Sequence, residues 1–135
     1  AGQHDKARII ADQASPVVSF LNLASVSDLE RVTKKPVDPI RFRANLWVSG
    51  MAPWAEHDWV GREVSIGGVR LAITKRIERC AATNVNPDTA ERDLNIPKAL
   101  QMGFGHIDMG VYGRVLDGGE MNVGDRVQVG GPAVL

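Results

Sequence analysis

The chain has 135 residues, with 16 basic and 16 acidic side chains and a single cysteine. This length suits one domain with its own core, and the balanced charge gives no argument for a nucleic acid or an anionic membrane as partner. One cysteine excludes an internal disulfide, a zinc ribbon and an iron–sulfur cluster held by this chain alone. The sequence has no apolar run of the roughly 20 residues that cross a bilayer and no signal-peptide pattern, so we expect a reducing cytoplasm.

The first part of the chain predicts a strand, a short helix and a second strand. Residues 17–24 are an apolar run of strand length. Ser27 precedes Glu30 by three residues, a spacing typical of a helix N-terminus, so we expect a short helix there. Residues 42–49 are typical of a strand and residues 50–58 of a loop.

The clearest local signal is a β-hairpin at residues 63–74. Apolar and polar residues alternate on both sides of Gly67 and Gly68, which form a two-residue turn. A turn-rich segment and one or two helical turns follow, and then two strands, at residues 84–92, 96–102, 111–116 and 127–129. Six or seven strands with little helix predict a mainly β fold, a closed or nearly closed β-barrel. We expect the barrel domain at residues 15–131, between a flexible N-terminal segment at residues 1–14 and a tail at residues 132–135.

Cys80 is the first candidate for chemistry. It follows Lys75, Arg76 and Arg79 in the sequence. Neighbouring cations favour the thiolate, which is the form that binds metals or attacks sulfur. A lone cysteine is as often a small buried apolar side chain, so both interpretations stay open.

A second candidate is the segment from Arg41 to Asn45, with the sequence RFRAN. Alternation on a strand would place Arg41, Arg43 and Asn45 on one face. Two guanidinium groups and an amide on a common face suit a phosphate or another anion. The alternative is a solvent-facing edge of the barrel.

The other polar motifs give weaker signals. His4, His57 and His106 lie far apart without metal-ligand spacing, so we expect surface or hydrogen-bonded residues. The Glu56–Asp58 segment is expected to be a solvated loop, with an acid–base cluster as the alternative. The glycine-rich segment at residues 103–106 is expected to be a flexible loop.

Several segments together resemble the MOSC family, named after the C-terminal part of molybdenum cofactor sulfurases. The family pattern has an RFRPN strand, a loop ending in an acidic residue and Trp, a CxRCxxTTVDPxTG segment and a GxYxxVLxxGxIxxGDxVxV tail. The matching stretches are Arg41 to Asn45, Ala55 to Trp59, Arg79 to Thr89 and Gly110 to Val129, and residues 25–30 match the family's first helix. The resemblance covers roughly residues 15–130 and is closest to the amidoxime-reducing branch.

This resemblance implies a MOSC-type β-barrel with a few short helices that binds the molybdenum cofactor, a pyranopterin. The family's key cysteine matches Cys80, which ligates molybdenum in the amidoxime-reducing branch and is proposed to carry sulfur in the sulfurase branch. Arg43 matches an arginine at the cofactor site. The expected cofactor-binding residues are Arg41, Arg43, Asn45, Arg79, Thr83 and Asn86. Pyridoxal phosphate binding is not expected.

The chain departs from the family pattern at four positions. Ile77 replaces the family's first cysteine, Ala44 a proline, Asn86 the aspartate of the turn and Ala90 the glycine after it. The smaller N-terminal domain of the amidoxime-reducing branch is not part of this chain, so we expect a separate N-terminal domain as one partner.

Three functions follow as alternatives. The first is an oxidoreductase domain that acts on N-hydroxylated compounds with Cys80 as molybdenum ligand. The second is a sulfur carrier with a persulfide on Cys80, and the third is a non-catalytic ligand-binding barrel. The chain has no dinucleotide fingerprint and no haem-attachment motif, so the partner is expected to be a redox protein that donates electrons or, for the carrier, a sulfur donor protein.

Overall fold

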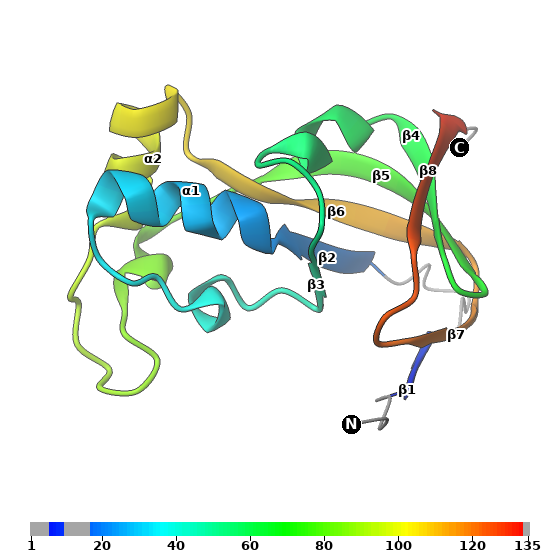
Figure 1. Ribbon diagram of the computed structural model, residues 1–135, viewed down its shortest axis with the longest axis horizontal. Coiled ribbons are helices and arrows are strands. Elements are labelled where there is room, and N and C mark those ends of the chain that lie inside the picture. Colours follow the sequence, from blue (N-terminus) through cyan, green and yellow to red (C-terminus); the bar gives the residue numbers. More distant parts are fainter. Residues whose placement is uncertain (1–5, 10–16, 134–135) are drawn as a thin grey trace. The chain divides into compact units, whose positions relative to one another are not determined.

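The computed structural model describes residues 6–9 and 17–133, which are mainly β (Figure 1). The helical elements are α1 (Leu23–Thr33), α2 (Ile96–Phe104) and the 3-10 helices η1 (Pro39–Phe42), η2 (Ala55–Trp59) and η3 (Ala81–Asn84). The strands are β1 (Lys6–Ile9), β2 (Val17–Asn22), β3 (Leu46–Val48), β4 (Arg62–Ile66), β5 (Val69–Glu78), β6 (Asp108–Asp117), β7 (Gly119–Asn122) and β8 (Val127–Pro132). The predicted fold class, mainly β with a few short helices, is confirmed. In these ranges no helix is both long and apolar enough to cross a membrane.

One compact unit comprises residues 59–75, residues 112–133 and the described residues before Ser19. Its strands follow the order β6-β5-β4-β8, and β1 pairs with β7. In the β4–β5 hairpin Val64 lies opposite Leu71 and Ile66 opposite Val69, and all four side chains are buried. The predicted hairpin is therefore confirmed.

The second compact unit comprises residues 19–58 and 76–111 and has the strand order β3-β2-β6-β5. β2 runs parallel to β3. The helices α1 and α2 pack against each other, and both contribute to one apolar cluster (Figure 1). Its buried members are Leu21, Val26, Leu29, Val37, Phe42, Ile96, Leu100 and Met109. All predicted cofactor-binding residues belong to this unit.

The first helix begins earlier than predicted. Asn22 is the N-cap of α1, because its side-chain Oδ1 accepts a hydrogen bond from the Ala24 N–H (3.0 Å). Val26 and Leu29 are buried on the helix face that meets the core. The predicted start at Ser27 is wrong, because Asn22 caps the helix at the end of β2.

The Arg41–Asn45 segment is not a strand. Pro39 starts η1, and the side chain of Asp38 caps it by accepting from the Ile40 N–H (3.0 Å). Arg43 follows with φ +51°, in the left-handed region, which turns the chain toward β3. The strand predicted at residues 42–49 is limited to β3, so the alternation of Arg41, Arg43 and Asn45 on one strand face is wrong.

The second helix runs further than predicted. It continues through Phe104 and ends at Gly105, whose φ of +77° is the left-handed conformation that glycine adopts without strain. The loop expected at residues 103–106 is therefore wrong for its first half. The helix end brings Phe104 and His106 to the start of β6.

Candidate functional site

Cys80 lies in an exposed position between two regular elements. It follows the last residues of β5 and is the N-cap residue of η3, with extended backbone angles. Its thiol is free and exposed. The interpretation of Cys80 as a buried core residue is wrong, and the thiol is accessible to a ligand or a reagent.

Arg79 fixes the backbone just before the thiol. Its Nε donates to the Met109 carbonyl (2.8 Å) and its Nη1 to the Phe42 carbonyl (3.1 Å). The guanidinium also lies over the Phe42 ring, 5.2 Å from its centroid. This cation–π contact and the two hydrogen bonds tie the start of the Cys80 loop to η1 and β6.

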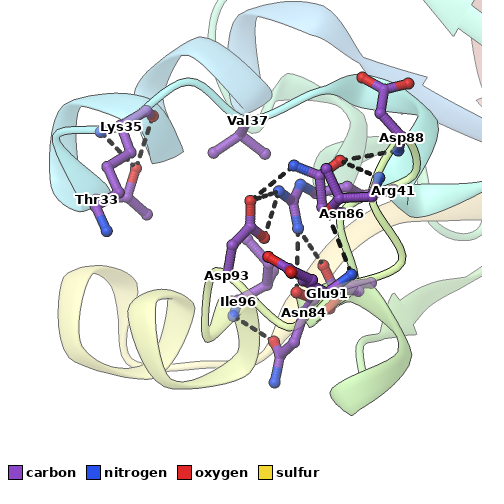
Figure 2. Close-up of polar contacts among 12 residues, drawn as sticks. Thr33, Lys35, Val37, Arg41, Asn84, Asn86, Asp88, Glu91, Asp93 and Ile96 are labelled. Atoms are coloured by element: carbon purple, nitrogen blue, oxygen red, sulfur yellow. Dashed lines mark hydrogen bonds and ion pairs between the residues drawn. The ribbon is translucent and has the colours of Figure 1, made fainter.

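Arg41 fixes the same loop just after the thiol (Figure 2). Its Nη1 donates to the carbonyls of Thr83 (3.4 Å) and Asn84 (3.2 Å). Its Nη2 contacts both carboxylate oxygens of Asp93, at 2.7 and 2.9 Å. The Arg41 side chain is only 3% exposed. We call Arg41 and Arg79 the arginine clamp, because they hold the Cys80 loop on both sides.

The other predicted cofactor-binding side chains also make internal contacts, with one exception. Thr83 is buried and its Oγ1 donates to the Cys80 carbonyl (2.8 Å). Asn45 Oδ1 accepts from the Ser19 N–H (2.7 Å). The exception is Arg43, whose side chain is exposed and makes no hydrogen bond or ion pair within residues 17–133. Arg43 is therefore the arginine best placed to contact a ligand.

Two departures from the family pattern have a structural explanation. Asn86 Oδ1 accepts from the Asp88 N–H (2.8 Å), a turn that an aspartate could also form, but Asn86 Nδ2 donates to Asp93 (2.9 Å), which an aspartate could not (Figure 2). These hydrogen bonds from Asn86 and Arg41 lower the pKa of Asp93. Ala90 has φ +61°, so it occupies the conformation that a glycine would adopt more easily.

A pocket of about 310 Å³ lies beside the Arg41–Asp93 ion pair. Its lining carries both charge signs, from Lys35, Pro36, Asp38, Arg41, Asn86, Pro87, Asp88, Asp93 and Leu94. The Arg41 guanidinium in its wall is already bound to Asp93 and to two carbonyls. The pocket wall is thus built from the same contacts that hold the Cys80 loop.

Glu56 is a buried structural residue. It is fully buried, and it accepts hydrogen bonds from Asn22 Nδ2 (2.9 Å) and Ser25 Oγ (3.0 Å). Burial raises the pKa of this carboxyl despite these donors. The solvated loop predicted at residues 56–58 is wrong for Glu56.

The structure brings together two histidines that are 49 positions apart in the printed sequence. The ring centroids of His57 and His106 lie 5.3 Å apart, and His106 also contacts the rings of Trp54 and Phe104. Burial, and then the positive charge of Arg76, lower the pKa of His57 to about 4, and the same two causes lower the pKa of His106. Sequence spacing gave no signal for this pair, because the contact joins η2 to the start of β6.

No metal-binding cluster accompanies the histidine pair. Within residues 6–9 and 17–133, no group of three or more His, Cys, Asp or Glu side chains could hold a metal ion. His4 lies outside the described residues. A metal at this unit would therefore depend on a ligand that brings donors of its own.

Comparison with known proteins gives related sequences of two kinds. The chain is 36% identical over 92 residues to "Mitochondrial amidoxime-reducing component 1" of Mus musculus, a match that covers 68% of this chain and 26% of that protein. It is 31% identical over 125 residues to "Mitochondrial amidoxime reducing component 2" of Bos taurus, covering 84% and 36%. It is 34% identical over 58 residues to "Molybdenum cofactor sulfurase" of Oryza sativa subsp. japonica, covering 43% and 7%. The matches therefore span only a minor part of these longer proteins.

Solved structures share the fold. The YiiM protein of Geobacillus stearothermophilus matches with a TM-score of 0.62 at 19% identity, over 83% of this chain and 53% of that one. The YUAD protein of Bacillus subtilis matches with a TM-score of 0.61 at 16% identity, over 86% and 64%. The model of the MOSC domain family matches residues 8–128, which is most of the chain. The chain therefore belongs to the MOSC domain family.

Proposed function

We propose that this chain binds the molybdenum cofactor and that Cys80 ligates the metal, within an oxidoreductase that acts on N-hydroxylated compounds. The observation that carries the proposal is the exposed Cys80 thiol on a loop held by the arginine clamp. A thiolate is a soft ligand of the kind that thiophilic metals prefer. A loop fixed on both sides holds this ligand in one position, which a redox metal site requires.

The polar residues around Cys80 fit the cofactor in two different ways. Arg43 is exposed without an ion pair among the described residues, so its guanidinium is available for the anionic phosphate of the pterin. Arg41 and Arg79 are held by internal hydrogen bonds, and they act by shaping the loop. Asn45, Thr83 and Asn86 support the same backbone. When bound, the cofactor supplies the two-electron redox chemistry that no side chain of this unit offers.

The proposed partner is a separate redox protein that delivers electrons. The matches cover no more than 36% of the amidoxime-reducing relatives, so a further domain of a longer protein is the second proposed partner. We propose the cytoplasm as the compartment, since a free thiol is stable under reducing conditions.

A sulfur carrier is the second candidate function, supported by the similarity to molybdenum cofactor sulfurases. The exposed thiol of Cys80 is accessible to a sulfur donor protein, as a persulfide carrier must be. A binding module without chemistry is the third alternative, and it would retain Arg43 as an anion contact while Cys80 would be dispensable.

Metal analysis of protein produced with the cofactor present tests the proposal. We expect molybdenum in the wild type, loss of the metal in Cys80→Ser, and about tenfold weaker cofactor binding in Arg43→Ala, which lacks one charge-assisted hydrogen bond. Cys80→Ala is a matched variant that removes the same ligand without a hydroxyl.

Two outcomes would contradict the molybdenum proposal. Full molybdenum occupancy in both Cys80 variants would show that Cys80 is not the ligand. A wild type without molybdenum, in which mass spectrometry finds one additional sulfur on Cys80, would favour the sulfur carrier. Reduction of an N-hydroxylated test compound, with and without an added electron-donor protein, then tests the partner.

A further inference from the structure

The ends of β5 and β6 place His106 opposite Cys80. The Arg79 N–H donates to the Ile107 carbonyl (2.9 Å), while Arg76 contacts Asp108, so residue numbers rise on one strand as they fall on the other. In such an antiparallel pair the next residues outward are also opposite each other. These residues are Cys80 and His106.

The two side chains leave the same face of the sheet. Ile77 and Met109 are buried and face the core. Alternation along each strand sends Arg76 and Asp108 to the other face, where they form an ion pair of 2.8 Å. Cys80 and His106 have the same parity as this pair. Opposite residues of this type have Cα atoms about 4.5 Å apart, with their side chains adjacent.

A backbone hydrogen bond selects the tautomer of His106. Its Nδ1 accepts from the Asp108 N–H at 3.0 Å. In a neutral imidazole with an accepting Nδ1, the hydrogen is on Nε2, so Nε2 is a donor. The lowered pKa of His106 agrees with a neutral ring. His106 therefore presents an N–H donor.

Neighbouring rings restrict the orientation of this donor. Trp54 lies edge-on to His106 at 5.7 Å, Phe104 stacks at 6.3 Å and His57 meets it at 5.3 Å. Trp54 has φ +65°, an unusual conformation for a bulky residue, and its Nε1 is anchored to Asp28 (2.8 Å). Such a surrounded ring has few alternative rotamers.

We propose that the His106 Nε2–H is the hydrogen-bond donor that orients the acceptor oxygen of a substrate beside the sulfur of Cys80. For the N-hydroxylated compounds of the proposed function, that oxygen is the hydroxyl on nitrogen. This assignment rests on Cys80 as the reactive centre. A neutral donor polarises the oxygen and fixes the position of the substrate, and no proton leaves His106.

Alkylation of Cys80 tests the donor in protein without cofactor, so the result is independent of metal binding. The measured quantity is the ratio of the alkylation rates with iodoacetate and iodoacetamide. Both reagents attack through the same thiolate, so the ratio cancels the thiolate population and reports how well the site binds a carboxylate oxygen. Cys80 is the single cysteine, so every adduct reports on it.

Two variants of His106 separate the donor from the acceptor of the ring. His106→Asn keeps an acceptor at the position of Nδ1 but has no donor at the position of Nε2, and we expect the ratio to fall about tenfold. His106→Gln keeps an N–H near the position of Nε2, and we expect a ratio within about twofold of the wild type. His57→Gln alters the same ring cluster without facing Cys80, and it should also leave the ratio unchanged.

The outcomes decide between a donor and a packing role. An unchanged ratio in His106→Asn, or an equal fall in His106→Asn and His57→Gln, overturns the inference. Thermal unfolding confirms that each variant is folded, and if His106→Asn is not, a ratio in folded His106→Gln below a tenth of the wild type also overturns it. If the ratio falls as expected while the wild type takes up no molybdenum, the donor assignment stands and the metal proposal fails.

Discussion

The two faces of the sheet at the end of β5 and β6 use their arginines differently. On the inner face, Arg79 donates to two backbone carbonyls and lies over the Phe42 ring. On the outer face, Arg76 pairs with the side chain of Asp108 and stays partly exposed. The inner face uses its polar groups to fix the backbone, whereas the outer face presents side chains to a ligand. Substitutions on the inner face should therefore act on stability, and those on the outer face on reactivity and pH response.

The largest effect is expected for Gly110→Ala on the inner face. Gly110 has φ +84°, and a Cβ there would lie 2.5 Å from the Phe20 carbonyl oxygen. Relief of this overlap requires β2 and β6 to separate, so we expect a loss of more than about 3 kcal/mol in unfolding free energy. Gly105→Ala is the matched control, since φ is +77° and no atom lies within 4 Å of the added Cβ. Denaturant unfolding should show about 1 kcal/mol for the control, and equal losses would contradict the close approach.

Arg41→Ala should cost about 2–3 kcal/mol of unfolding free energy. The guanidinium is almost fully buried, and its removal leaves Asp93 and the Thr83 and Asn84 carbonyls without their donor. The matched control is Arg43→Ala, which removes an exposed arginine from the same segment and should change stability by less than about 0.5 kcal/mol. Urea unfolding measures both. Similar losses would mean that Arg43 is also structural.

His57→Gln should reduce the pH dependence of stability. The folded-state pKa of His57 is about 4, below the ordinary value of 6.5. Protonation therefore favours the unfolded chain, and the stability associated with neutral His57 is present above pH 6.5 and is lost as the pH falls toward 4. Thermal melts should show a larger drop in Tm between pH 7 and pH 5 for the wild type than for the variant. Parallel profiles would contradict the lowered pKa.

The smallest effect is expected for Ala90→Gly. The left-handed φ of Ala90 is strained for alanine, and glycine relieves that strain while its unfolded chain gains freedom. The net result should be a gain of up to about 1 kcal/mol in unfolding free energy. A loss in thermal or urea unfolding would show that the turn does not hold Ala90 in this conformation.

The elements that sequence reasoning predicted correctly depend on local contacts. The hairpin around Gly67 and Gly68 follows from alternation and a two-residue turn. The family motifs predicted the fold class and located the Cys80 loop. At Pro39 local chemistry gave a different result, because the Asp38 cap and the fixed φ of proline favour a 3-10 turn over the strand that alternation predicted.

The parts of the site that could not be predicted are long-range. Arg41 and Asp93 are 52 positions apart, and neither neighbourhood indicates the other. His57 and His106 are paired only because η2 lies over the start of β6. Sequence alone identified Arg41 and Arg43 as equivalent, and only the ion pair with Asp93 distinguishes the buried arginine from the exposed one.

The arginine clamp has a consequence for synthesis on the ribosome. Its contacts join Phe42 to Arg79 and Arg41 to Asp93, over separations of 37 and 52 residues. Closing loops of this length is slow compared with forming a turn or a hairpin. The Cys80 loop can acquire its final shape only after Asp93 has emerged from the exit tunnel, so the nascent chain exposes an unshaped thiol first and a competent ligand site later.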